Sequence, residues 1–260
     1  MVGLSYQTIG VNVVLEAINK QLCRSKVGRR LKTTALDLSK PLWYCKPMYL
    51  FLDNEMGGLE RDKYSLLTVY LLMTDDQFKE IGNLYLYLKP DDGIYKVCGD
   101  AMNVNRIDLK VHDRIAITYK EGGTKLYNWL KQLTNEGKNK ATVVGHGIYG
   151  DVDWICHYLM NKATWEIFTS YRKLDTSAVC QFLRACGLFP DTVSGSLISL
   201  AQHFGIPADE NACHDAKYDT ELTYKVFVAL VKQMTPIIEV KPKTITEAGK
   251  DFWNIVKNIE

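Results

Sequence analysis

Three apolar segments that follow one another closely constrain the fold of this chain more than any other feature of its sequence. They cover residues 47–55, 65–74 and 83–89, and each has the length of a single β-strand. The first is apolar almost throughout, which is typical of a buried strand, and the third alternates apolar with polar residues. Because only short turns separate the three segments, they predict an antiparallel meander.

Helices and one further strand are expected after the meander. Residues 91–122 are rich in turn formers, and residues 141–147 have the pattern of a short buried strand that ends in glycine. Apolar residues at helical spacing predict helices at 124–133, 151–160, 174–187, 194–205 and 214–234, the last of them stopped by Pro236. This order predicts an α/β fold, in which a mixed sheet carries helices on both faces.

The composition excludes an integral membrane protein and a disulfide scaffold. The chain of 260 residues is 47% hydrophobic and 24% charged, as is ordinary for a soluble globular protein. None of its apolar runs approaches the roughly 20 residues of a membrane span, and the N-terminus lacks the pattern of a secretory signal. The seven cysteines include no CxxC pair, so we expect reduced thiols in an intracellular protein and no zinc framework.

Basic residues are concentrated near the N-terminus. The net charge of the chain is +2, but residues 20–46 alone carry +7, which leaves −5 for the remainder. Two interpretations of this stretch stay open: a surface that contacts phosphates and steers a polyanion, or a solvated face without a partner. A nuclear-import signal within residues 26–32 is a further option, whereas Glu16 disfavours a mitochondrial presequence. We therefore expect a cytoplasmic or nuclear location.

Two carboxylates stand two residues apart at the end of the first apolar strand. Side chains at this spacing point to the same face of a strand, so Asp53 and Glu55 are expected to lie together. Their mutual repulsion raises a pKa unless a cation lies between them, and Mg²⁺ and Mn²⁺ prefer carboxylate oxygen. The alternative is a solvated turn, because Asp, Asn and Gly also favour turns.

Two further groups of polar residues flank expected helices. Asp151 and Asp153 follow the glycine-rich end of the strand at 141–147, where their alternative role is to stabilise a helix N-terminus. His214 and Asp219 stand five residues apart at the start of another helix, and this spacing can bring both to one site. A histidine is a suitable general base because its pKa lies near neutrality. The alternative is a surface histidine beside a capping acid.

The order, spacing and surroundings of these groups resemble the DEDDh class of 3′–5′ exonucleases, the DnaQ-like family with an RNase H-like fold. The residues that match its motifs, in chain order, are Asp53 and Glu55 with the following Gly58-Leu59, then Asp151, then His214 and Asp219. A sister class has tyrosine at the position of Asp215, so the histidine class is the better match. The resemblance covers about residues 47–234, and residues 171–176 are most similar to the corresponding segment of oligoribonucleases.

This resemblance implies a mixed five-stranded sheet flanked by helices. An exonuclease domain at residues 47–234 would lie between a basic extension at 1–46 and a helical tail at 235–260. Two Mg²⁺ or Mn²⁺ ions are implied as cofactors. The eight residues that receive a role are the metal-binding and catalytic Asp53, Glu55, Asp151 and Asp219, the general base His214, and the substrate-binding Met56, Leu59 and His146.

The activity that the resemblance implies is metal-dependent release of 5′-mononucleotides from single-stranded 3′ ends of DNA or RNA. The alternative is a nuclease-fold module that binds nucleic acid or protein without catalysis, against which the intact set of four acids and a histidine argues. The chain departs from the family at Gly147 and Gly150, where Asn and an aromatic residue are usual, and at Met56-Gly57, where threonines are usual. Apolar residues near both termini either bind a protein partner or a second copy, or cover the domain's own core.

Overall fold

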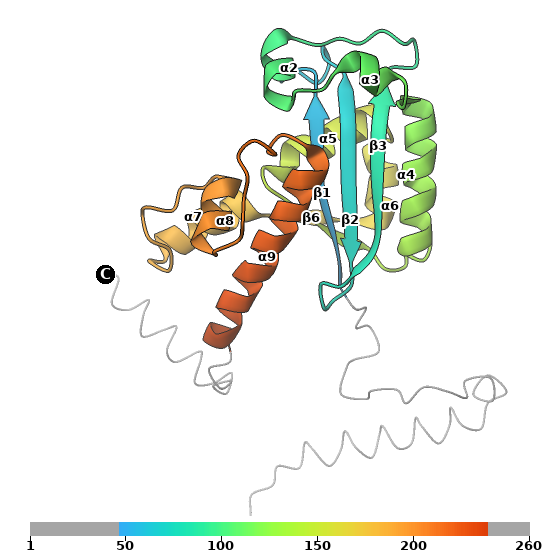
Figure 1. The fold of residues 1–260 in the computed structure, drawn as a ribbon. Helices are drawn as coiled ribbons and strands as arrows, with labels where there is room; N and C mark the ends of the chain where they lie inside the picture. The colour runs from blue at the N-terminus through green and yellow to red at the C-terminus, as the bar shows by residue number, and fades with distance from the viewer. Residues whose placement is uncertain (1–46, 239–260) are drawn as a thin grey trace, which may run out of the picture. The chain divides into compact units, whose positions relative to one another are not determined.

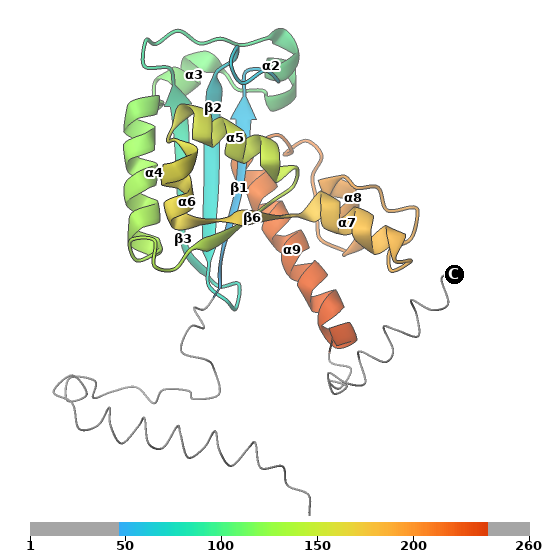
Figure 2. The same ribbon diagram turned by 180° about the vertical axis from the view of Figure 1, so that it is seen from behind.

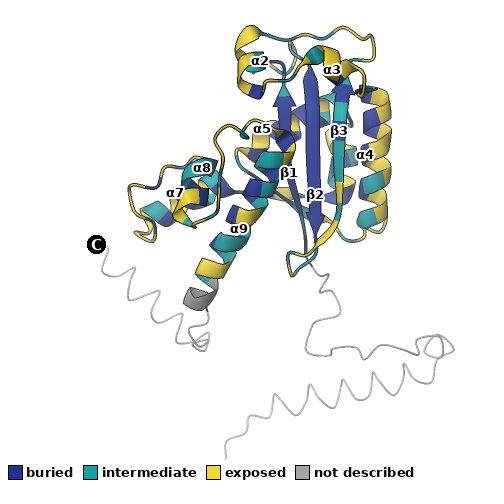
Figure 3. Cartoon of the chain, viewed as in Figure 1, coloured by how far each residue is buried: buried dark blue, intermediate teal, exposed yellow. Residues whose placement is uncertain are grey.

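The first strand of the expected meander lies in the interior of the sheet and separates two apolar layers. The structure, a computed structural model, describes residues 47–238 and has β1 (Met48–Met56) between β2 (Leu66–Thr74) and β5 (Ala141–Gly145). β2 is buried along its whole length, and β1 is largely buried (Figure 3). Both strands are covered on two faces, which explains their nearly continuous apolar sequences.

The sheet is mixed and has its strands in the order β4–β3–β2–β1–β5–β6 (Figure 1). β1, β2 and β3 (Glu80–Lys89) pair antiparallel, which confirms the meander. β5 is parallel to β1, and β6 (Thr169–Asp175) is parallel to β5. The expected α/β class with a mixed sheet is therefore confirmed, and β4 (Ile117–Thr118), only two residues long, adds a sixth strand to the expected five.

Alternation along β1 directs its side chains into two different helix layers. Leu50 and Leu52 pack with α4 (Tyr119–Leu133) and α5 (Ile148–Tyr158) on one face, whereas Phe51 packs against Phe227 of α9 (Ala216–Ile238) on the other. Figures 1 and 2 show α4, α5 and α6 on one face of the sheet and α9 across the opposite face. The helices are α2 (Gly99–Asn105), α3 (Leu109–Asp113), α4 (Tyr119–Leu133), α5 (Ile148–Tyr158), α6 (Lys162–Phe168), α7 (Thr176–Ala185), α8 (Leu197–His203) and α9 (Ala216–Ile238).

A second apolar core holds α9 from the side away from the meander. Cys180 of α7, Leu200 of α8 and Val226 of α9 are all fully buried in one cluster. Figure 1 shows α7 and α8 beside α9. α9 thus packs simultaneously on the sheet and on α7 and α8. Contact with both cores fixes the direction of the helix, and its first turn lies near the carboxyl end of β1.

Several element boundaries differ from those expected. α4 begins at Tyr119 rather than at residue 124, because Thr118 and Glu121 form a capping box. α9 continues to Ile238, so Pro236 does not stop it. A proline in the last turn removes one backbone hydrogen bond but has little helix after it to disrupt.

Five elements were not expected from the sequence patterns: α2, α3, β4, α6 and β6. β6 lies at an edge of the sheet and has exposed polar residues, so its sequence lacks an apolar repeat. The apolar spacing of residues 11–22 predicts one more helix, but these residues lie outside the described range, as do the basic stretch and the tail from residue 239. Within residues 47–238, no helix combines the length and the apolar character that crossing a membrane requires.

Candidate active site

Two carboxylates end the buried central strand on the face that α9 covers. Phe51, Asp53 and Glu55 alternate along β1, so the acids continue the row of side chains that begins with Phe51. Asp53 lies opposite Tyr70, and Glu55 lies opposite Thr68 on β2. Because β5 runs parallel to β1, the carboxyl ends of both strands meet at this edge, where α/β sheets commonly bind ligands.

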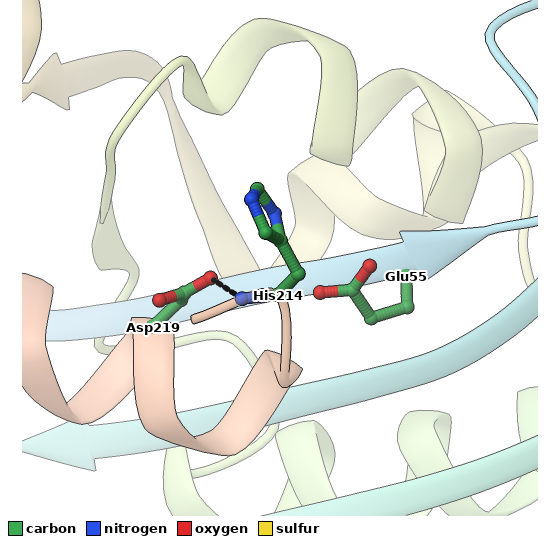
Figure 4. Close-up of side chains that lie close together, drawn as sticks. All are labelled: Glu55, His214 and Asp219. Carbon is green, nitrogen blue, oxygen red and sulfur yellow. Dashed lines mark hydrogen bonds between the residues drawn. The ribbon is translucent and has the colours of Figure 1, made fainter. Parts of the chain in front are cut away.

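His214, just before α9, and Asp219, in the first turn of α9, lie beside this edge. The N–H of His214 donates to Oδ2 of Asp219 at 2.9 Å, and Figure 4 shows the Asp219 and Glu55 carboxylates on either side of His214. His214 has a φ of 65°, a left-handed conformation that few residues other than glycine adopt. The capping acid of α9 is Asp215, whose Oδ1 accepts the N–H of Tyr218 at 2.9 Å. Asp219 therefore lies one turn further along the helix and faces the site.

Asp151 reaches the same edge from α5. The chain leaves β5 through Gly147, whose φ of 79° is left-handed and suits glycine. α5 then begins at Ile148, and Asp151 lies in its first turn with 7% of its surface exposed. The side-chain amide of Asn54 donates to the backbone carbonyl of Asp151 at 2.8 Å. This bond ties the start of α5 to β1, between Asp53 and Glu55.

All eight residues to which the sequence assigned a role line one cavity of about 620 Å³. They are Asp53, Glu55, Met56, Leu59, His146, Asp151, His214 and Asp219. Cys98, Ala101 and Val104, from α2 and the residue before it, line the cavity as well. The cavity thus combines an acidic floor with an apolar wall. The eight predicted residues come from three parts of the chain, and their chemical roles remain predictions.

The acidic floor is electrostatically unfavourable for the protein alone. Burial raises the pKa of Asp53 well above its ordinary value, and the charges of Asp151 and Glu55 raise it further. Burial and the charge of Asp219 raise the pKa of Glu55 to about 8. Burial also raises the pKa of Asp151 and of Asp219. A divalent cation would relieve this repulsion by favouring the ionised carboxylates.

The donor set fits such a cation. One ligand atom each from Glu55, His214 and Asp219 lie within 4.8 Å of one another (Figure 4). Asp53 and Asp151 line the same cavity and supply further carboxylate oxygens, which Mg²⁺ and Mn²⁺ prefer. The arrangement also allows the imidazole of His214 to act as a ligand, a role that the sequence did not suggest.

The three residues expected to contact substrate differ in exposure. Leu59 is 95% exposed at the cavity mouth, whereas Met56 is half-buried and its carbonyl accepts the side-chain amide of Asn105 at 3.1 Å. Nδ1 of His146 hydrogen-bonds to the hydroxyl of Thr176 at 2.9 Å, and burial lowers the pKa of this imidazole. The imidazole of His146 is therefore held by Thr176 in the cavity wall, whereas the side chain of Leu59 is open to solvent.

Close packing explains one departure from the family motif. The N–H of Gly57 donates to the carbonyl of Ser65, and its carbonyl accepts the N–H of Cys98. A Cβ on Gly57 would lie 2.6 Å from the carbonyl oxygen of Lys96. The segment 96–98 therefore approaches so closely that a threonine at residue 57 does not fit without a shift of backbone.

The structure distinguishes the two aspartates of α5. Asp153 is exposed, and its carboxylate accepts Nη1 of Arg61 at 2.6 Å. Asp151 is buried in the cavity, so the structure favours it over Asp153 as the residue that matches the motif. Sequence reasoning missed Asn54, Asn105 and the capping role of Asp215. The sequence could have drawn attention to Asn54, which stands between the two acids, and to Asp215, which stands at a helix start. Nothing in the sequence around Asn105 marks it as part of the site.

No protein-family model matches this chain. The chain is similar to the protein named ribonuclease T of Wigglesworthia glossinidia brevipalpis, with 24% identity over 188 residues, which are 70% of this chain and 83% of that protein. Ribonuclease T of Blochmanniella pennsylvanica (strain BPEN) is 24% identical over 189 residues, with the same coverage of 70% and 83%.

Solved structures share the fold. E. coli exonuclease I in complex with a dT13 oligonucleotide superposes with a TM-score of 0.59 at 19% identity, covering 74% of this chain and 42% of that chain. Exonuclease I without ligand superposes with a TM-score of 0.58 at 18% identity, and the match covers 74% of this chain and 43% of that chain. The chain thus spans less than half the length of exonuclease I. At this identity the likeness establishes the RNase H-like fold that the sequence predicted.

Proposed function

We propose that this chain is a metal-dependent 3′–5′ exonuclease of the DEDDh, DnaQ-like type, which releases 5′-mononucleotides from single-stranded 3′ ends of nucleic acid. The observation that carries the proposal is the convergence of four carboxylates and a histidine, from three separate parts of the chain, on one cavity. The similarity to proteins named ribonuclease T and the fold shared with exonuclease I support it. The dT13 oligonucleotide bound by exonuclease I supports a single-stranded substrate.

In the proposed mechanism the carboxylates hold the cofactor and the histidine moves a proton. Asp53, Glu55, Asp151 and Asp219 would hold two Mg²⁺ or Mn²⁺ ions. When bound, two such ions activate a water molecule and stabilise charge on the leaving 3′-oxygen. His214 takes the proton from the attacking water, because a histidine side chain can both accept and return a proton. Met56, in the apolar wall, and His146 hold the terminal nucleoside. Leu59 packs on the base of this nucleoside.

The decisive experiment measures degradation of matched substrates. Single-stranded and duplex oligonucleotides of DNA and of RNA, labelled at the 5′ end, are incubated with Mg²⁺, with Mn²⁺ or with EDTA. We expect stepwise shortening from the 3′ end that EDTA abolishes, and 5′-mononucleotides as the product. A duplex with a 3′ mismatch separates a proofreading preference from general turnover. Absence of metal-dependent shortening on every substrate would contradict the proposal and favour a binding module without catalysis.

Two substitutions test the assigned roles. Asp53→Ala and His214→Ala are each expected to abolish the metal-dependent shortening, with rates at least about 100-fold lower. Asp153→Ala serves as the control, because this aspartate lies on the same helix as Asp151 but is exposed and paired with Arg61. Calorimetric titration with Mn²⁺ separates the two roles of His214. If His214→Ala binds Mn²⁺ as the unchanged protein does, the histidine is a base; weaker binding would make it a ligand.

Two expectations from the sequence remain proposals. A protein partner or self-association would use residues near the termini, which lie outside the described range. An intracellular location, in the cytoplasm or the nucleus, follows from the sequence alone. Neither affects the chemistry proposed for the cavity.

A further inference from the structure

The turn that carries His214 has a backbone conformation that requires support. His214 has a left-handed φ of 65°, which is sparsely populated by residues other than glycine and persists only where surrounding contacts hold it. Two of these contacts lie within the turn itself. The N–H of His214 donates to Asp219, and the N–H of Tyr218 donates to Oδ1 of Asp215, each at 2.9 Å.

A third contact reaches this turn from the sheet. The hydroxyl of Tyr85, on β3, donates to Oδ2 of Asp215 at 3.1 Å across 130 residues of sequence. Both oxygens of the Asp215 carboxylate are therefore engaged, one by the helix and one by the sheet. Asp215 directly follows His214, so whatever fixes Asp215 also fixes the backbone that carries the imidazole.

Tyr85 is itself held in place by neighbouring rings. Its ring stacks on that of Tyr87 with centroids 4.4 Å apart, and meets that of Tyr70 edge-on at 5.3 Å. These partners lie on β3 and β2, in the most regular part of the sheet. The hydroxyl is therefore a preorganised donor rather than the end of a mobile side chain.

The location of the contact separates it from the catalytic cavity. Tyr85 and Asp215 line a smaller cleft of about 250 Å³, which the larger cavity adjoins at Glu55, Asn105 and His214. Asp215 lines only the smaller cleft, whereas Met56 and Leu59 line only the larger cavity. A group in this position can orient the histidine without occupying the space of the substrate.

We propose that Tyr85 is a positioning residue, which acts through Asp215 to hold the His214 turn and so directs the imidazole into the catalytic cavity. This inference rests on the proposed function, because it concerns the orientation of the proposed base. Neither residue belongs to the motifs by which the chain resembles exonucleases, and the juxtaposition follows from the packing of β3 against the start of α9.

The test removes one hydroxyl group and leaves the rings in place. Tyr85→Phe is compared with Tyr224→Phe, which removes a hydroxyl that donates to the carbonyl of Phe78 at 2.9 Å, elsewhere on α9. With a single-stranded oligonucleotide and saturating Mg²⁺, Tyr85→Phe is expected to lower kcat about tenfold and to change KM less than about twofold, because misplacing a proton acceptor affects the chemical step rather than binding. Tyr224→Phe is expected to keep the kcat of the unchanged protein.

A second measurement does not depend on activity. Hydrogen exchange of the Tyr218 and Asp219 amides, in the first turn of α9, is expected to be about tenfold faster in Tyr85→Phe than in Tyr224→Phe, because the cap of this turn is loosened. Unchanged exchange would overturn the proposal. So would an unchanged kcat in Tyr85→Phe, or an equal loss in both variants. If the unchanged protein degrades no substrate, the proposed function fails, and the exchange rates alone then decide whether Tyr85 holds the turn.

Discussion

At the scale of single residues, the buried acids of β1 link the chemistry of the site to the stability of the fold. Burial and neighbouring charge raise the pKa of Glu55 from 4.5 to about 8, and that of Asp53 rises as well. The folded protein without bound cations therefore holds more protons than the unfolded chain over this interval. By linkage, its free energy of unfolding falls as the pH rises from about 4.5 to 8.

The prediction concerns Glu55→Gln. Without divalent ions, this variant is expected to be more stable than the unchanged protein at pH 8, by a few kcal/mol at most. At pH 4.5 the two are expected to be nearly equal, because Glu55 is then protonated in the folded state. Urea unfolding in EDTA at both pH values measures the difference. Added Mn²⁺ should raise the stability of the unchanged protein at pH 8 and that of Glu55→Gln much less; a parallel rise in both would contradict the assignment of Glu55 as a ligand.

A second prediction at this scale separates the two aspartates of α5. Asp151→Asn is expected to lower the degradation rate at least about 100-fold, because this carboxylate lies buried in the cavity. Asp153→Asn is expected to retain activity and to lose less than about 1 kcal/mol of stability, since an exposed ion pair such as that with Arg61 contributes little. Initial rates and urea midpoints for both variants check this. Equal activity of the two would show that Asp151 holds no metal.

The position of the acids could be predicted from sequence because it depends on local periodicity. Asp53 and Glu55 share a face of β1 for the reason that any residues two apart do. The contacts that fix the surrounding backbone instead join residues that lie far apart in the sequence. Asn54 meets Asp151 across 97 residues, and Tyr85 meets Asp215 across 130, so each depends on the final packing of the sheet.

At the scale of elements, local signals decided which boundaries were predictable. The central strands are long, apolar and bounded by turns, and they were found. The start of α4 was misplaced although Thr118 and Glu121 stand in the spacing of a capping box. β6 offered no such signal, because an edge strand has one side without a partner strand and tolerates polar residues.

The cap of α4 gives a prediction about stability alone. Thr118→Ala removes the acceptor for the N–H of Glu121 and is expected to lower the free energy of unfolding by about 1 kcal/mol. Thr118→Ser retains the acceptor and serves as the control. α4 covers the face of the sheet away from α9, so the rate of degradation should not change in either variant (Figure 2). A changed rate in Thr118→Ala at a temperature where the protein is fully folded would contradict this separation of stability from activity.

At the scale of the whole molecule, the charges are distributed unevenly. The chain as a whole carries +2, with +7 in residues 20–46 and −5 in the remainder. Four of the acids outside that stretch line the candidate metal site, and two divalent ions would bring the remainder to about −1. With metal bound, the basic stretch would then dominate the electrostatic field that a nucleic acid encounters.

The final prediction tests whether that stretch contacts phosphates or is only solvated. Replacing Arg29, Arg30 and Lys32 by glutamine should weaken binding of single-stranded nucleic acid at low salt and leave kcat unchanged, because the cavity is intact. If all three contact phosphates, the slope of log affinity against log salt concentration should fall by about 2, at about 0.7 per contact for single strands. The control replaces three exposed lysines of α4 and the turn after it, Lys125, Lys131 and Lys138. Fluorescence anisotropy of a labelled oligonucleotide, with Ca²⁺ in place of Mg²⁺ to slow degradation, gives the slope for each variant. Equal slopes in the unchanged protein and in both triple variants would assign the basic stretch to a solvated face, and the attraction of substrate would then have to come from cations elsewhere on the chain.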